Sequence, residues 1–264
     1  MSEIDIQNQL FDLTTNNIML AEAFLFNDVF SRDAKVILFF YRTFCNCLIY
    51  RPNQTELYIK YLIDVYQKLN RLQRNTFNKI ILGWSFHLPG PNIVHLFVLY
   101  RLFDLKLISL NEIIQYMRNF RFANNHIKLN LIYCLMWFAP EIKQKYEHFY
   151  QLLLGDLKDF KQNNPHSLLL IGLDENSLFR NNFELLKQYR KQGHNHNSLI
   201  SIIINDDVSA LQNYIAQFKI DFNQVINPSF FEICPFIQNQ PTLIELTAFF
   251  GSIKCFKYMW SCIL

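Results

Sequence analysis

The sequence predicts an all-α protein in which an N-terminal array of helices is followed by short helix pairs. Apolar residues recur three and four positions apart along most of the 264 residues, and this spacing places them on one face of a helix. The chain has only six glycines and contains no Asn-Gly or Asp-Gly pair, the usual two-residue hairpin turns. We therefore expect at least eight helices and no sheet of three or more strands.

Helical periodicity is clearest in the first half of the chain, where six stretches of about 10 to 18 residues have the length of ordinary helices. These stretches cover residues 33–50, 54–69, 75–86, 93–107, 111–120 and 126–138. Short polar links separate them, so we interpret them as one helical array.

Prolines mark several boundaries between these helices. Proline is tolerated in the first turn of a helix but not in its interior, so we place breaks at Pro52 and over residues 88–91. For the same reason we expect Pro140 to end or kink the sixth helix.

The sequence also indicates where one domain gives way to the next. Helical periodicity weakens over residues 161–182, and a further helix over residues 183–192 should end at Gly193, a left-handed cap. We therefore predict an N-terminal helical domain of unknown function, residues 1–182, and a C-terminal repeat region of about two units, residues 183–264.

Two segments of the C-terminal region are alike. SLISIIINDDVSALQNYIA begins at Ser198, and TLIELTAFFGSIKCFKYMW begins 44 positions later at Thr242. Each predicts a short apolar helix, a turn and a second short amphipathic helix. Thr242 can cap its helix through its hydroxyl group, and Gly251 suits the turn because a positive φ costs glycine nothing. In the first copy Asp206 and Asp207 occupy the turn, where we expect both at the N-terminus of the next helix.

The second copy resembles the ankyrin repeat, whose pattern is Thr-Pro-Leu-His-x-Ala-Ala-x-x-Gly followed by paired apolar residues. The matching positions are Thr242, Leu243, Ala248, Gly251, Cys255, Phe256, Met259 and Trp260. The histidine is missing, and the spacing of 44 exceeds the usual 33 or so residues. The extra length lies in residues 223–240.

A larger part of the chain resembles one family of ankyrin-repeat proteins. Residues 192–208, 228–236 and 241–259 resemble a large family from trichomonad-type protists, and residues 105–149 show scattered similarity. Proteins of that family carry a helical region of unknown function ahead of their ankyrin array. The resemblance implies protein binding and supplies no catalytic residue.

Composition and charge exclude several classes of protein. Hydrophobic residues make up 51% and charged residues 18%, enough apolar surface for a folded core. The net charge is +3, whereas nucleic-acid binders usually carry more positive charge, and clustered. The one weak cluster, Lys187, Arg190 and Lys191, is interpreted as a solvated helix face.

We expect a cytoplasmic protein without a membrane partner. The longest apolar runs, such as residues 131–139, are about half of the 18 to 20 residues that span a bilayer. The N-terminus, with Glu3 and Asp5, is not that of a signal peptide. In a reducing compartment the six cysteines would remain thiols.

No motif predicts a catalytic, cofactor-binding or metal-binding residue. Cys45 and Cys47 are two positions apart and would point in different directions on a helix. His194 and His196 lie in a loop without a third ligand. Glycines are too sparse for a phosphate-binding loop, and no Gly-x-Ser-x-Gly motif occurs.

The sequence therefore predicts a non-catalytic protein–protein interaction module of ankyrin-repeat type that binds an unknown protein partner. Two alternatives stay open: a helical nucleic-acid-binding protein, and an enzyme with an unrecognised site in its N-terminal half. Clustering of Lys187, Arg190, Lys191 and Lys219 on one face would support the first alternative.

The end of the chain carries a further expectation. The sequence stops inside or just after a second repeat helix and has no polar cap, although terminal repeats normally present a polar outer face. We expect the apolar side chains near this end, most of them aromatic, to be partly exposed. The helix face that they form would then belong to a longer ankyrin protein, or it would dock on another chain, which could be a second copy of this one. The residues concerned are Phe249, Phe250, Phe256, Trp260 and Ile263.

Overall fold

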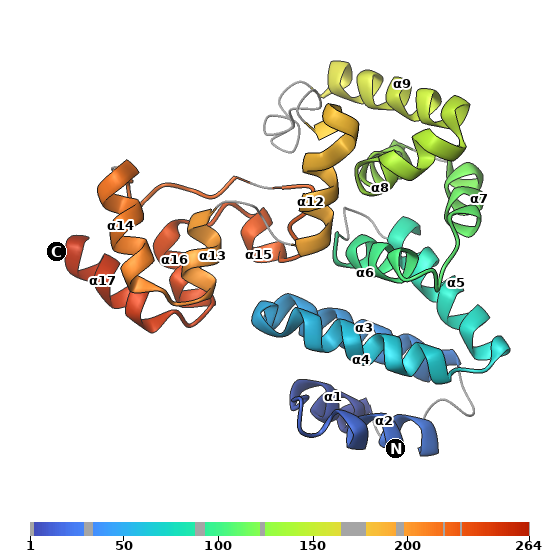
Figure 1. Cartoon of the computed structure of the whole chain (residues 1–264), viewed down its shortest axis with the longest axis horizontal. Helices are drawn as coiled ribbons and strands as arrows, with labels where there is room; N and C mark the ends of the chain where they lie inside the picture. Colours follow the sequence, from blue (N-terminus) through green and yellow to red (C-terminus); the bar gives the residue numbers. More distant parts are fainter. Residues whose placement is uncertain are drawn as a thin grey trace. The chain divides into compact units, whose positions relative to one another are not determined.

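The computed structural model confirms the all-α class (Figure 1). It describes residues 3–28, 34–87, 93–121, 125–164, 178–193, 198–218, 220–227 and 229–263. Within these ranges there are 15 α-helices and no strand, and the only β-type pairing is an isolated bridge between Val225 and Thr242. The chain divides into two compact units, residues 1–162 and 163–264, which are described separately.

The described residues of the first unit form nine α-helices. They are α1 (Glu3–Phe11), α2 (Ile18–Asp28), α3 (Ala34–Tyr50), α4 (Thr55–Lys68), α5 (Arg71–His87), α6 (Ile93–Asp104), α7 (Leu110–Phe120), α8 (Asn125–Lys145) and α9 (Glu147–Asn163). The six predicted stretches correspond to α3 through α8, although α5 begins four residues earlier than expected. The sequence did not single out α1, α2 and α9.

The core of this unit lies around α6 and α8, which pack against each other and against α5. All nine residues of 131–139 in α8 are buried, and a helix that is apolar on every side belongs in the interior of a domain. Trp137 is fully buried, and its ring lies 6.2 Å from that of Phe97 and 5.9 Å from that of Tyr100. These aromatic contacts join α6 to α8.

Pro140 does not end the helix in which it lies. We expected Pro140 to end or kink the helix; it does not end it, because α8 continues five residues further, to Lys145. Proline removes one backbone hydrogen bond from a helix interior. Here the fully buried turns that precede it supply the packing that keeps the helix continuous.

Tyrosine hydroxyl groups attach the first two helices to α4. The Tyr58 hydroxyl donates to the carbonyl oxygen of Leu10 at 2.9 Å, and the Tyr61 hydroxyl donates to that of Ala21 at 3.2 Å. Both rings are buried. These hydrogen bonds join the backbone of α1 and α2 to α4, and they also give the buried hydroxyl groups a partner.

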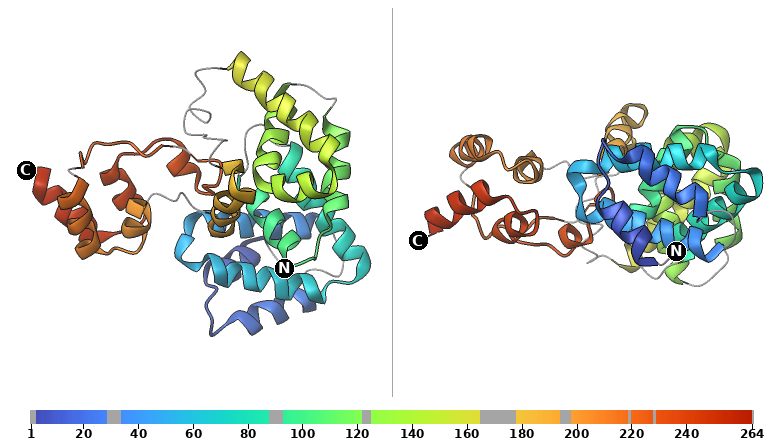
Figure 2. Two further views of the ribbon diagram at one scale, coloured as in Figure 1. Left: turned by 45° about the horizontal axis from the view of Figure 1, so that its top comes forward. Right: turned by 90° about the horizontal axis from the view of Figure 1, so that it is seen from below.

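The described residues of the second unit form two helix pairs, the preceding helix α12 and two short helical segments. Its elements are η2 (Asn181–Phe183), α12 (Glu184–Gln192), α13 (Ser198–Ile204), α14 (Val208–Phe218), α15 (Pro235–Gln238), α16 (Leu243–Phe249) and α17 (Ile253–Ile263). Within a pair, α13 packs on α14 and α16 on α17. Between pairs, α13 packs on α16 and α14 on α17, so first helices and second helices form two layers (Figure 2).

The boundary between the two units lies after residue 162, whereas the sequence placed it after residue 182. The expected helix ahead of the repeats is present as α12, and it ends as predicted at Gly193, which has a φ of 68°. Contacts with the segment between the two helix pairs hold α12 in the second unit: the Ile233 N–H donates to the carbonyl oxygen of Gly193 at 3.1 Å.

Replacing Phe97 by alanine should destabilise the first unit by about 3–5 kcal/mol, because it leaves a cavity beside Trp137. Leu72→Ala is the control: Leu72 is 75% exposed and should change stability by less than about 0.5 kcal/mol. The measurement is urea unfolding of protein labelled with 5-fluorotryptophan, in which the ¹⁹F signal of Trp137 reports on this unit. Equal midpoints for the two variants would contradict the packing of α6 and α8.

Candidate functional site

The turn inside each helix pair contains one residue with a positive φ. Gly251 has a φ of 64°, as predicted, and Asp206 has a φ of 52° at the corresponding place in the first pair. The backbone hydrogen bonds agree: Asp207 donates to Ile202 at 3.1 Å, and Ser252 donates to Thr247 at 2.9 Å. The equivalent turn residues, Asp206 and Gly251, are thus 45 positions apart. The sequence comparison used a spacing of 44 positions and therefore paired Gly251 with Asp207.

Asp206 connects the two helix pairs. Its carboxylate accepts hydrogen bonds from the backbone N–H groups of Cys255 at 2.9 Å and Lys254 at 3.2 Å, both in the first turn of α17. In the opposite direction, the buried Ser252 hydroxyl donates to the carbonyl oxygen of Ile203. The two turns therefore bind each other through one side chain from each.

The two turn aspartates have different roles, which corrects the expectation that both serve the following helix. Asp207 does so, because its carboxylate accepts from the N–H of Ala210 in α14 at 3.0 Å. Asp206 caps α17 of the next pair instead. Partial burial raises the pKa of Asp206, but the N–H groups of Cys255 and Lys254 outweigh this effect and hold the pKa below its ordinary value of 3.8.

The predicted cap of α16 is present as a reciprocal capping box. The Glu245 N–H donates to the Thr242 hydroxyl oxygen at 3.4 Å, and the Thr242 N–H donates to the Glu245 carboxylate at 2.8 Å. Two donors that a helix start leaves without partners are thus satisfied. The backbone N–H and the hydroxyl of Thr242, which both donate to the Glu245 carboxylate, also lower the pKa of Glu245.

The segment between the two pairs is folded against its neighbours. The Ile226 N–H donates to the carbonyl oxygen of Pro241 at 3.0 Å, and the five residues 230–234 are all buried. The ring of Phe231 meets that of Tyr189 in α12 edge to face, with centroids 5.7 Å apart. The extra length of this repeat therefore forms part of the core of the second unit.

Helix α17 has apolar side chains on two adjacent sides, one buried and one partly exposed. Cys255 and Met259 are buried on the side that packs toward α14 and α16. Ile253, Phe256 and Trp260 recur at i, i+3 and i+7 and form the other side, which we call the α17 outer face. Ile253 is 61% exposed and Trp260 51%, and the rings of Phe256 and Trp260 are stacked with centroids 5.9 Å apart.

Partial exposure extends to the neighbouring aromatic residues, as expected for this end of the chain. Phe249, Phe250 and Phe256 are each partly exposed. The ring of Phe249 stacks on that of Phe236 with centroids 4.3 Å apart. The side chain of Ile263, the remaining member of the predicted set, lies outside the described residues.

Of the three basic residues of α12, Arg190 does not share a solvated face with Lys187 and Lys191. Lys187 lies 3.5 Å from Glu184 as an ion pair, Arg190 is buried, and Lys219 lies outside the described residues. The interpretation of this cluster as a solvated face is therefore wrong for Arg190.

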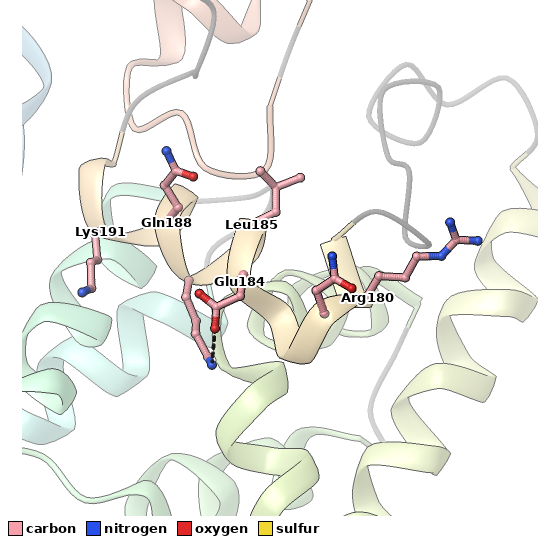
Figure 3. Close-up of a pocket in the computed structure, with 7 residues that line it drawn as sticks. Arg180, Glu184, Leu185, Gln188 and Lys191 are labelled. Carbon is pink, nitrogen blue, oxygen red and sulfur yellow. Dashed lines mark hydrogen bonds and ion pairs between the residues drawn. The ribbon is translucent and has the colours of Figure 1, made fainter.

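A hollow of about 580 Å³ lies on the surface of α12 (Figure 3). Its lining residues are Arg180, Asn181, Glu184, Leu185, Lys187, Gln188 and Lys191. Figure 3 shows Glu184 between Arg180 and Lys191. The hollow thus has mixed charge, and nothing in it matches the continuous basic groove that nucleic acid requires.

The first unit contains a buried cysteine–histidine–tyrosine cluster that sequence reasoning missed. His95 Nδ1 lies 3.4 Å from the Cys45 Sγ and 3.0 Å from the Tyr41 hydroxyl. Burial lowers the pKa of His95 to about 4 and raises that of Cys45 far above its usual range. The thiol is therefore protonated and the imidazole neutral at pH 7, whereas a nucleophilic cysteine needs a lowered pKa. The only signal in the sequence was a single histidine within the apolar stretch 93–107.

The described residues provide no group of three or more His, Cys, Asp and Glu side chains that could hold a metal ion. Cys45 contacts His95, whereas Cys47 is buried next to Tyr58, and burial raises its pKa to about 11. The loop that contains His194 and His196 lies outside the described residues.

Comparisons with known proteins add no family assignment. No family model, no curated protein and no solved structure matches the chain. Among the described residues, no helix combines the length and the apolar character needed to cross a membrane. The function must therefore be inferred from the residues and the geometry above.

Replacing Gly251 by valine should destabilise the second unit by about 1 kcal/mol or more, because a β-branched residue is strained at positive φ. A Cβ atom at this position would meet no atom within 4 Å, so the cost comes from the backbone conformation. Gly251→Asn should cost less, since asparagine enters this region more easily. The readout is urea unfolding followed through the ¹⁹F signal of labelled Trp260; equal losses for valine and asparagine would refute the explanation.

Asp206→Asn should remove part of the pH dependence of the second unit. The folded pKa of Asp206 lies below its ordinary value of 3.8, so the charged form stabilises the fold above that pH. This contribution is lost as the pH falls through the folded pKa. Asparagine keeps an oxygen acceptor and tolerates positive φ. The urea midpoints of wild type and variant should converge between pH 6 and pH 2.5, and parallel pH profiles would show that the carboxylate charge has no role.

Proposed function

We propose that this protein is a non-catalytic protein–protein interaction module of ankyrin-repeat type and that it binds its partner through the α17 outer face. The observation that carries the proposal is that the apolar surface of α17 extends beyond its buried side onto Ile253, Phe256 and Trp260, of which Ile253 and Trp260 are exposed. Cys255 and Met259 account for the buried side. Ile253 and Trp260 are mostly exposed, so burial in the second unit accounts for little of their apolar surface.

The composition of the α17 outer face supports a binding role. Single exposed apolar residues are common on protein surfaces, but Phe256 and Trp260 form a stacked pair next to the exposed Ile253. Tryptophan is among the residues most enriched at the energetic centres of protein interfaces. A stacked pair held on a helix is also rigid before binding, which reduces the entropy lost on association.

The stacking of the two helix pairs supports the ankyrin-type interpretation. First helices pack on first helices and second helices on second helices, so each pair presents one side to its neighbour. The outer side of the second pair is the one on which a further pair, or another protein, would pack. A cytoplasmic location fits the same proposal, since cysteines such as Cys234 and Cys255 are buried thiols.

The proposal is tested by capturing partners from the source cell with the 264-residue chain and with its Trp260→Ala variant. Loss of a central interface tryptophan costs about 2 kcal/mol or more, so partner recovery should fall at least tenfold. Leu20→Ala, which removes a side chain 72% exposed in the first unit, is the matched control. Undiminished recovery with Trp260→Ala would contradict the proposal, and sedimentation of the purified chain shows whether the partner is a second copy.

A further inference from the structure

The first unit has a groove between α3 and α5, with a volume of about 500 Å³. Its lining residues are Lys35 and Leu38 from α3, and Thr76, Lys79, Ile80, Gly83 and Trp84 from α5. Leu38, Ile80 and Trp84 are partly exposed and make the groove largely apolar. Because Gly83 has no side chain, α5 leaves the groove open at that level.

The apolar surface continues along α5 beyond the groove. Leu72, Thr76, Ile80 and Gly83 are spaced so that they lie on one side of the helix, and Leu72 is 75% exposed. The eleven residue steps from Leu72 to Gly83 correspond to about 16 Å along the helix axis. The surface therefore has the length of about three turns of a second helix laid along it.

The two helices that form this groove carry positive charge only. Their basic residues are Lys35, Arg42, Arg71, Arg74 and Lys79, and neither helix contains an aspartate or a glutamate. Lys35 and Lys79 lie on the groove itself and are exposed. Arg74 donates to the Tyr66 carbonyl oxygen at 3.2 Å and is engaged inside the unit. A ligand along the groove would meet apolar side chains flanked by ammonium groups.

We propose that the α3–α5 groove binds an acidic amphipathic helix of a partner protein. Its apolar residues would lie over Leu38, Ile80 and Gly83, and its carboxylates would pair with the ammonium groups of Lys35 and Lys79. This is the helix-in-groove mode of recognition, in which residues at i, i+3, i+4 and i+7 enter an apolar groove. The interaction goes beyond the proposed function, because it uses other residues in the other unit.

The shape of the groove favours a helix over a small amphiphile such as a fatty acid. Small-molecule sites enclose most of their ligand, whereas this groove is open to solvent along α5. An extended apolar strip with charged residues along it matches the side of an amphipathic helix. Charge complementarity would also make binding depend on salt concentration, because the lysines are exposed.

Trp84 provides a direct signal for binding. It lines the groove, is partly exposed, and its ring meets that of buried His95 edge to face with centroids 5.3 Å apart. The chain has three tryptophans; Trp137 is fully buried and Trp260 is exposed. In a Trp260→Phe background, a ligand that covers the groove should shift the fluorescence of Trp84 to shorter wavelength.

The experiment titrates the full-length Trp260→Phe protein with a tryptophan-free 18-residue peptide of Leu, Ala and Glu, patterned as an amphipathic helix. We expect a saturable blue shift. A peptide with Lys in place of Glu should bind at least tenfold more weakly. Lys79→Glu should weaken binding of the acidic peptide about tenfold, as expected for loss of a complementary charge. Lys158→Glu, the same charge reversal at an exposed position of α9, should have no effect.

A second variant tests the groove without changing charge. Gly83→Leu favours the helix and fills the opening, so it should also weaken binding of the acidic peptide. Circular dichroism establishes that each variant is folded. Three results would overturn the proposal: no shift with the acidic peptide, equal binding of both peptides, or a shift with monomeric dodecanoate that the acidic peptide cannot produce. The peptide titration is independent of the partner-capture experiment: if Trp260→Ala did not reduce partner recovery, the expected binding of the acidic peptide to the groove would be unchanged.

Discussion

The organisation of the second unit depends on one interaction, the hydrogen bonds from the first turn of α17 to the carboxylate of Asp206. The first N–H groups of a helix have no partner within the helix. Here the turn of the preceding helix pair supplies one, and the Ser252 hydroxyl returns a hydrogen bond to that turn. With α17 held in this way, Cys255 and Met259 are buried, Phe256 is partly exposed and Trp260 is exposed.

A different constraint shapes the first unit. Its core consists largely of aromatic side chains, and the polar groups buried among them form hydrogen bonds with neighbouring groups of the same core. The Asn130 side chain, for example, donates to the carbonyl oxygen of Phe86 at 2.7 Å inside the core. The cluster of Cys45, His95 and Tyr41 belongs to the same category, because its groups are neutral and bonded to one another. The cluster is therefore a hydrogen-bonded polar contact inside an apolar core. The surface of this unit that we propose for binding lies elsewhere, along α5.

The sequence predicted those features that depend on residues close together in the chain, such as helix positions, caps and turns. Hydrophobic periodicity located α3, α4 and α7 to within a residue or so at most ends, and the cap at Thr242 and the turn at Gly251 followed from hydroxyl and glycine chemistry. It did not single out α9, whose apolar residues are interrupted by charged ones. A helix end at Pro140 was wrong because the packing that holds α8 together comes from other helices; a kink there stays a prediction. The partner of Asp206 lies almost 50 positions away, and no local pattern indicates such a contact.

The central claim is that the two helix pairs form one stack joined by their turns. Hydrogen exchange measured by NMR at the Cys255 amide tests it most directly, since this amide would have no partner in an isolated α17. The account predicts slow exchange at this amide in the wild type, and exchange near the rate of an unprotected amide in Asp206→Ala. Fast exchange of the Cys255 amide in the wild type, while amides in the middle of α17 remain protected, would contradict it.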